Sequence, residues 1–386
     1  MSRRYEDFDE FCDPENPRTI SFEDVVSAAK RIKPHIPVTP CLPSHYQREF
    51  AMNLYYKLET VQRTGSFKER GALNVLELLP LDKKKIGVVV ASLGNQAVGI
   101  CFYAAKLGIP VVVVMPTCVP IVKLQKCHSL GAKVVVQGSN LLEAHRYARA
   151  LARDKGLTYI NGRDHPHILA GYGTMALEIL SQVPNVDAII VPIGSGGLAA
   201  GIITVIKHLR PNCLVYLLVN EDWIARAILH LIEKERYIAE GSAACSLASI
   251  IGSLVPELKL KNVVCILTGG NIDAILLARC MDRGLAAEGR LVKFKVGIRD
   301  TSEANAQLLK LLANAGYNVR RQFRDHVWVE NEVYTVEIKL VCETKGLEHS
   351  LELKRIVERA YPCSSTFETE PFNDKRTCPC YVRKCI

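Results

Sequence analysis

Residues 66–72 place a lysine directly before an expected helix, in the order Ser66-Phe67-Lys68-Glu69. Burial disfavours the charged form of a lysine, and a neutral lysine is a nucleophile that forms a Schiff base with a carbonyl carbon. A lysine taken alone at such a place is more often an ordinary surface residue. Lys68 is therefore a candidate catalytic residue only if other segments point to the same chemistry.

Residues 92–97 follow an expected strand and open a helix, and they include Ser92, Leu93, Gly94, Asn95 and Gln96. The free amides of a helix N-terminus attract anions, so this loop can hold a carboxylate. Ser, Gly and Asn are also common N-cap residues, so the alternative is a helix start that binds nothing.

A third segment, again between strand and helix, consists of Gly194, Ser195, Gly196, Gly197 and Leu198. Such small residues let backbone amides approach a phosphate. The lysine of a Walker loop does not follow, and no third glycine stands at the offset of a dinucleotide fingerprint. The alternative to a phosphate site is a glycine-rich turn without a ligand.

The elements around these loops alternate between short β-branched runs and helical patterns, which predicts an α/β fold with parallel sheets covered on both faces. In such folds ligands bind at the carboxyl ends of the strands. Thr268 stands at such an end, after an expected strand at 263–267. The expected strands are 87–92, 111–115, 133–136, 158–160 and 188–193, and the expected helices are 119–130, 140–155, 173–182 and 198–209.

After about Gly289 the pattern changes to a βαββαβ-like order of roughly seventy residues, typical of a small α+β domain. We expect strands at 291–299, 318–324, 327–329 and 334–342, and helices at 303–315 and 347–360. We divide the chain into a disordered leader (1–18), an α/β domain (19–289), the α+β domain (290–362) and a disordered, cysteine-rich tail (363–386).

Composition excludes several classes of protein. A chain of 386 residues with 48% hydrophobic and 23% charged residues is a globular protein of two to three domains. The net charge is +9, and the lysines and arginines are scattered along the chain, which fits an anionic small molecule better than a nucleic acid as ligand.

No signal peptide is recognised at the N-terminus, so the fourteen cysteines predict free thiols in the cytoplasm. Residues 188–206 lack charge, but their glycines predict strand, loop and helix instead of a membrane span.

Together and in this order, the segments resemble fold-type II pyridoxal-phosphate enzymes, specifically the threonine/serine dehydratases. The resemblance covers roughly residues 19–362. It rests on ISFEDVVSAAKRIKPHIPVTPCL, KLETVQRTGSFKERGALN, HPHILAGYGTMALEIL, VPIGSGGLAAGI and AEGSAA, and the segment from RLVKFKV to ERAYP resembles an ACT-type regulatory domain. The resemblance implies a tryptophan-synthase-β-like fold of two α/β subdomains.

The resemblance also implies a role for each candidate residue. Lys68 would form the Schiff base with pyridoxal 5'-phosphate and act as general base, with Phe67 beside the cofactor ring. Asn95 would contact the pyridine 3-hydroxyl, and Thr268 would face the ring nitrogen. Residues 92–96 would hold the substrate carboxylate, residues 194–198 the cofactor phosphate, and Glu240 would lie at the edge of the site. The implied reaction is elimination of water from L-threonine or L-serine, giving a 2-oxo acid and ammonia.

Several positions depart from that family pattern. Leu93 stands where racemases carry a serine base, which argues against racemisation. Gln96 replaces a usual histidine, Tyr172 replaces a usual glutamine, and Asp300-Thr301-Ser302-Glu303 replaces an Asp-x-Pro-Gly loop, which argues against effector binding there.

The largest departure is that Glu240 follows Leu198 by only 42 residues, an interval in which the family carries further strands and helices. Two hypotheses follow: an active dehydratase, or a catalytically impaired or shortened relative that acts as a binding or regulatory protein. We expect no metal, no membrane and no nucleic-acid partner, and by family habit a homodimer or homotetramer. His165 and His167, or the four cysteines after residue 362, are weaker metal candidates.

Overall fold

The computed structural model describes residues 9, 11–13, 15–218, 223–327, 333–368 and 383–385. The chain divides into two compact units. The first comprises residues 1–224, 231–273 and 380–386, and the second comprises residues 225–230 and 274–379. The boundary thus falls at Asp273, sixteen residues before the one we expected, because the long helix α13 (Ala274–Ala287) groups with the second unit.

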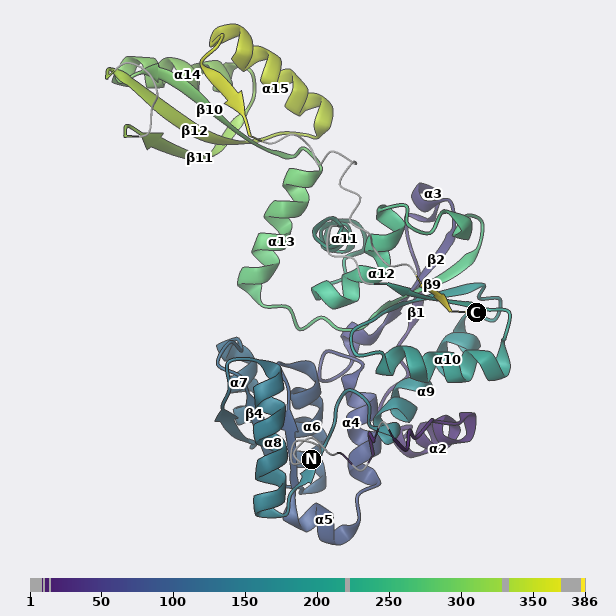
Figure 1. Ribbon diagram of the computed structural model, residues 1–386. Helices are drawn as coiled ribbons and strands as arrows, with labels where there is room; N and C mark the ends of the chain where they lie inside the picture. The colour runs from purple at the N-terminus through teal and green to yellow at the C-terminus, as the bar shows by residue number, and fades with distance from the viewer. Residues whose placement is uncertain are drawn as a thin grey trace. The chain divides into compact units, whose positions relative to one another are not determined.

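One sheet of the first unit is purely parallel and has the order β5-β4-β3-β6. Val88 and Val90 of β3 face the core shared with helices α6 and α7, whereas Val89 and Ala91 face helix α8. Figure 1 shows these helices around β4. The bounds are β3 (Val88–Ala91), β4 (Val111–Met115), β5 (Lys133–Val136), β6 (Thr158–Tyr159), α6 (Asn95–Leu107), α7 (Ile121–Ser129) and α8 (Leu141–Lys155). They follow the expected ranges closely, because continuous apolar strands need cover on both faces.

The second sheet of this unit has the order β1-β2-β9-β7-β8-β14, with a parallel centre and antiparallel edge strands. Its strands are β1 (Cys41–Pro43), β2 (Asn53–Leu58), β7 (Ala188–Pro192), β8 (Leu214–Leu218), β9 (Asn262–Leu267) and β14 (Arg383–Cys385). The helices of this part of the unit are α2 (Phe22–Ile32), α3 (Gln47–Phe50), α9 (Pro166–Gln182), α10 (Gly197–Leu209) and α12 (Gly241–Ile251), and α4 (Lys68–Glu77) and α5 (Leu81–Ile86) precede β3. The expected fold class is confirmed.

Helix α9 begins at Pro166, seven residues before the start we expected. Two glycines inside this helix, Gly171 and Gly173, serve close packing. A Cβ on Gly171 would lie 2.6 Å from Arg70 O in α4, and one on Gly173 would lie 2.9 Å from Gly201 O in α10. The backbones of three helices therefore meet along α9, where no side chain fits.

The second unit contains a four-stranded antiparallel sheet of order β11-β12-β10-β13. Its elements are α11 (Ile224–His230, of which residues 225–230 belong here), α13, β10 (Leu291–Arg299), α14 (Ser302–Asn314), β11 (Asn318–Asp325), β12 (Thr335–Glu343), α15 (Leu347–Ala360) and β13 (Ser365–Phe367). Inward residues of β10 and β12 pack with Leu308 of α14 and Leu353 of α15 in one core. The order of these elements is βαββαβ, the order predicted for the domain, but its last strand is β13 and not one of the strands expected up to residue 342.

Two sequence predictions need correction. Ser365–Phe367 was expected in a disordered tail but pairs with β10 as the last strand of the second unit, because the sheet has an open edge there. Residue 327, expected to start a strand, lies outside any strand, and residues 328–332 lie outside the described residues. In the leader, residues 1–8, 10 and 14 are likewise not described, whereas Phe11 stacks on His165 at 4.5 Å. Most of the tail, residues 369–382 and 386, is also outside the description.

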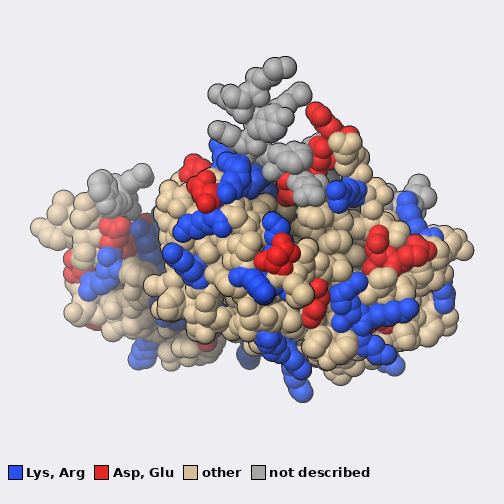
Figure 2. Space-filling model, turned by 90° about the horizontal axis from the view of Figure 1, so that it is seen from below, with Lys and Arg blue, Asp and Glu red and all other residues tan. Residues whose placement is uncertain are grey.

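No helix among the described residues is long and apolar enough to cross a membrane. The uncharged stretch 188–206 forms β7 and most of α10, as predicted. On the face drawn in Figure 2, lysine and arginine side chains are interspersed with aspartate and glutamate and form no single basic surface.

Candidate active site

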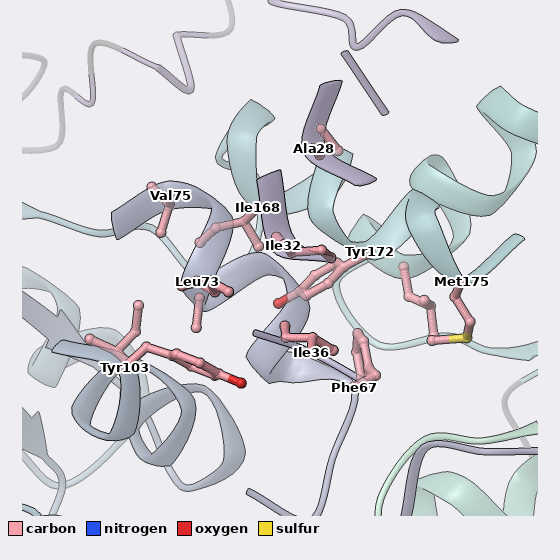
Figure 3. Packing of buried hydrophobic residues seen from close by; sticks show 14 of the residues in the cluster. Ala28, Ile32, Ile36, Phe67, Leu73, Val75, Tyr103, Ile168, Tyr172 and Met175 are labelled. Atoms are coloured by element: carbon pink, nitrogen blue, oxygen red, sulfur yellow. The ribbon is translucent and has the colours of Figure 1, made fainter. Parts of the chain in front are cut away.

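Lys68 is the first residue of α4, and its side chain is half-buried. Its Nζ lies 4.8 Å from the centre of the Phe67 ring and 4.9 Å from the centre of the Tyr172 ring. Figure 3 shows both rings in the apolar cluster under the site. Burial lowers the pKa of Lys68 from 10.5 to about 8; Glu240 opposes this shift and Arg163 adds to it. Among the described residues, its amine has no hydrogen-bond partner.

The residues after Lys68 hold the start of α4 in place. Glu69 is fully buried and accepts hydrogen bonds from Thr64 N at 2.7 Å and from Tyr103 Oη at 3.2 Å. Arg70 is also buried and forms ion pairs with Glu59 at 2.8 Å and with Glu178 at 2.7 Å. Paired and hydrogen-bonded buried charges of this kind fix the position of a helix.

Ser92 and the residues after it form the start of α6, at the carboxyl end of β3. Ser92 Oγ accepts hydrogen bonds from Gly94 N at 3.1 Å and from Ala97 N at 3.4 Å. In the part of the chain that the structure describes, the amides of Asn95 and Gln96 have no acceptor, and neither has the buried Gln96 Nε2. The loop therefore presents donors of the kind that bind an anion, while Leu93 is exposed.

Glu240 is brought to this loop from the start of α12. Asn95 Nδ2 donates to Glu240 Oε1 at 2.7 Å, and Ser242 Oγ donates to the same oxygen at 2.9 Å. Asn271 Nδ2 donates to Asn95 Oδ1 at 3.0 Å. The side chain of Asn95, which we expected to contact the cofactor hydroxyl, thus also positions the carboxylate of Glu240 near Lys68.

The glycine segment at 194–198 lies between β7 and α10, and Gly196 has a φ of +91° that favours glycine. A Cβ on Gly194 or Gly196 would meet no atom within 4 Å, so open space lies beside both. Ser195 Oγ contacts Arg163 O at 3.5 Å, and a Cβ on Gly197 would lie 2.8 Å from that same oxygen. Arg163 acts electrostatically on Lys68, so its segment connects the glycine loop with the lysine.

Thr268 follows β9 and is buried beside the lysine loop. Its carbonyl accepts a hydrogen bond from Phe67 N at 3.0 Å, and the next residue, Gly269, forms a bridge with Ser66. The structure therefore gathers Lys68, Phe67, Asn95, Glu240 and Thr268 around one place.

Sequence reasoning gave no role to Arg163 or Asn271 and treated Tyr172 only as a departure from the family pattern. The two glycines before Asn271 were a local signal that could have found it. Arg163 carries no such signal, since only the fold brings it to the site. For His165 and His167, the described residues contain no group of three or more metal-ligating side chains. Of the four late cysteines, Cys378 and Cys380 lie outside the described residues.

The site fits a ligand that has a carbonyl, an aromatic ring and an anionic group. Ser66 Oγ, Thr64 Oγ1 and Gln96 Nε2 are buried without a hydrogen-bond partner among the described residues, and an unsatisfied buried polar atom costs about 1–3 kcal/mol. Open space beside Gly194 and Gly196 leaves room for a phosphate at the start of α10. The neutral amine of Lys68 can attack a carbonyl carbon.

These features define an α/β protein whose candidate site is arranged around a half-buried lysine, and comparison with known proteins gives its family. Residues 32–218 match the family model described as pyridoxal-phosphate dependent enzyme. The L-threonine ammonia-lyase of Thermotoga maritima is 31% identical over 88% of this chain and 97% of its own length. This chain belongs to the threonine dehydratase family of pyridoxal-phosphate-dependent enzymes.

Solved structures agree with the fold. Processed threonine deaminase isoform 2 from Solanum lycopersicum has a TM-score of 0.64 and 27% identity, covering 69% of this chain and 90% of that one. A pyridoxal 5'-phosphate-dependent aspartate racemase also has a TM-score of 0.64, with 28% identity, covering 68% of this chain and 99% of that one. The fold is therefore shared by lyases and racemases, and the fold alone does not choose between them.

The comparison also indicates that this chain lacks residues that its relative has. The alignment with the Thermotoga protein spans 391 positions but only 88% of this chain, about 340 residues, so about 50 positions lie opposite gaps in this chain. In the structure only residues 219–223 separate β8 from α11. This is the interval in which the sequence predicted a loss.

Proposed function

We propose that this protein catalyses the pyridoxal-phosphate-dependent β-elimination of L-threonine or L-serine. Water is eliminated first, and hydrolysis of the product then gives a 2-oxo acid and ammonia, so the net change is loss of ammonia. The observation that carries the proposal is Lys68, a half-buried lysine whose amine lies beside two aromatic rings and whose pKa is lowered to about 8.

The residues have distinct tasks in this proposal. Lys68 would hold the cofactor through its amine, and the same amine would remove the α-proton of the substrate as general base. Residues 194–198 hold the phosphate, Thr268 offers a neutral hydroxyl to the ring nitrogen, and Phe67 packs beside the ring. Residues 92–96 hold the substrate carboxylate through the amides of Asn95 and Gln96, and Glu240 lies at the edge of the site. When bound, pyridoxal phosphate supplies the electron sink for the carbanion.

Leu93 supports elimination over racemisation. Racemisation needs a second proton-exchanging group on the opposite face of the substrate, and a leucine side chain has no exchangeable proton. A neutral hydroxyl at Thr268 leaves the ring nitrogen unprotonated, which disfavours transamination.

A second candidate function rests on the gap of about 50 alignment positions. The missing segments include family loops that face the substrate, so a shortened chain that binds the cofactor but does not turn over is the alternative. It would act as a binding or regulatory protein.

Two measurements distinguish the candidates. The visible spectrum of the purified protein should contain a cofactor band that is absent in Lys68→Ala, and L-threonine should yield 2-oxobutanoate. A cofactor band without any oxo acid from L-threonine or L-serine supports the regulatory candidate. A protein without a Lys68-dependent band overturns the enzyme proposal.

The rest of the molecule has roles that fit this reading. We propose that residues 290–362, extended to β13, form an ACT-like regulatory domain, and that residues 19–289 form the catalytic domain.

We propose that the protein is a homodimer or homotetramer and that it is located in the cytoplasm. None of the eleven cysteines whose side chains the structure describes forms a disulfide, which supports a reducing compartment.

A further inference from the structure

Lys123 of α7 lies across the loop at the start of α6. A Cβ built on Gly94 would lie 2.8 Å from Lys123 Nζ and 2.9 Å from its Cδ. The space beside Gly94 is thus filled by a lysine side chain from another helix. A methyl group at position 94 would displace the end of the Lys123 side chain from this place.

The packing of α7 aims Lys123 at this loop. Cys127 is fully buried in the same core cluster as Cys101 of α6, and Leu124 packs against that cluster. Lys123 precedes Cys127 by four residues, so the two side chains lie on the same face of α7. Cys127 packs against α6, so the face of α7 that carries both residues is the one that faces α6. Lys123, one turn earlier on that face, therefore lies at the N-terminal end of α6, next to Gly94 and Asn95.

Lys123 is half-buried, and its ammonium group has neither a hydrogen bond nor an ion pair within the described part of the chain. The amides of Asn95 and Gln96, which follow Gly94, also have no acceptor there, and neither has the buried Gln96 Nε2 of the same loop. Four donor groups thus gather at one loop without an acceptor, and one of them carries a full positive charge. An anion is the ligand that satisfies all four.

We infer that Lys123 is a substrate-binding residue, which pairs with the α-carboxylate of the amino acid held by residues 92–96. This inference rests on the proposed function, since it takes the loop as the carboxylate site. It adds a charged partner from α7 to a site whose other donors are neutral. Lys123 binds the substrate and exchanges no proton, so its loss should affect binding more than turnover.

The test compares an unreactive amino acid with its neutral amide. L-Alanine has no β-leaving group, and L-alaninamide has the same shape without the carboxylate charge. Each is titrated into the holoenzyme, and the change in the visible spectrum gives its Kd. Lys123→Gln should raise the Kd for L-alanine by about tenfold, as expected for loss of one charge-assisted hydrogen bond. The Kd for L-alaninamide should change by less than about twofold.

Two variants serve as controls. Lys123→Arg retains the positive charge, so most of the difference in Kd between L-alanine and L-alaninamide should remain. Lys133→Gln removes a positive charge from an exposed position at the start of β5 and should leave both Kd values unchanged. For L-threonine, Lys123→Gln should raise KM by a similar factor with little change in kcat.

Other outcomes refute the inference. If Lys123→Gln raises the Kd for both ligands equally, Lys123 only supports the loop. If it raises neither Kd, the substrate carboxylate binds elsewhere. Both results overturn the role of Lys123 while leaving the proposed function intact. A cofactor spectrum that responds to no amino acid in the unmodified protein overturns the proposed function as well.

Discussion

The hydroxyl of Tyr172 donates a hydrogen bond to Gln96 Oε1 at 3.0 Å. These are two of the positions at which the sequence departs from the family pattern, and the structure makes them partners. The Tyr172 ring also packs on Phe67, with ring centres 4.7 Å apart, and lies beside the amine of Lys68. Tyr172 and Gln96, which both differ from the family pattern, therefore link residues 92–96 to Lys68 through one hydrogen bond and one ring contact.

Tyr172→Phe should keep the ring but remove this hydrogen bond. Because the buried amide of Gln96 then loses its remaining side-chain partner, we expect a loss of about 1–3 kcal/mol in the free energy of unfolding. The KM for L-threonine should also rise. Tyr216→Phe is the matched control, since it removes a 2.9 Å hydrogen bond to Glu257 from a buried ring. An unchanged KM in Tyr172→Phe would show that the pair has only a structural role.

The lowered pKa of Lys68 predicts how cofactor loading depends on pH. The neutral amine is the nucleophile, so the rate at which the cofactor-free protein regains its visible band should rise with pH. It should level off above about pH 8, because burial lowers the pKa of Lys68 to about 8. A rate that still climbs steeply between pH 9 and 10 would contradict this assignment.

Glu240→Gln should shift that pH profile to lower pH. The carboxylate of Glu240 stabilises the ammonium form of Lys68, so its removal lowers the pKa of Lys68 further. The midpoint of the loading rate measures the shift. The control Glu233→Gln changes a glutamate outside the site and should not move the midpoint. A midpoint that moves to higher pH in Glu240→Gln would refute the electrostatic coupling between Glu240 and Lys68.

Gly194→Ala should separate cofactor binding from folding. A Cβ on Gly194 meets no atom of the protein within 4 Å, and this glycine has no positive φ, so the free energy of unfolding of the cofactor-free protein should change little. The methyl group would occupy the space that we assign to the phosphate, so the Kd for pyridoxal phosphate should rise. Gly297→Ala in the second unit, which makes only ordinary contacts, should alter neither quantity.

Glu59→Gln should destabilise the first unit strongly. Glu59 and Arg70 are both buried, and Arg70 holds the pKa of Glu59 below its usual value. Breaking a buried ion pair costs about 3–5 kcal/mol, measured as the free energy of unfolding in urea. The exposed pair Lys234–Glu49 offers the comparison, because Glu49→Gln should cost about 1 kcal/mol or less. Similar losses in both variants would contradict the assigned role of burial.

The sequence by itself determined the α/β alternation, most strand positions and the loops that carry Lys68, Ser92, Gly194 and Thr268. These follow from local physics, since apolar runs, glycines and helix starts leave signals within a few residues. It also predicts a lost segment before Glu240, because the interval is too short for the family pattern.

Only the tertiary structure decided what surrounds those loops. The early start of α9 depends on helix backbones that meet at Gly71, Gly171 and Gly201. The hydrogen bond of Asn95 to Glu240 and the position of Lys123 across Gly94 join residues far apart in the chain. Such contacts depend on how helices pack, and no local pattern of residue types encodes which distant side chain will fill a given space.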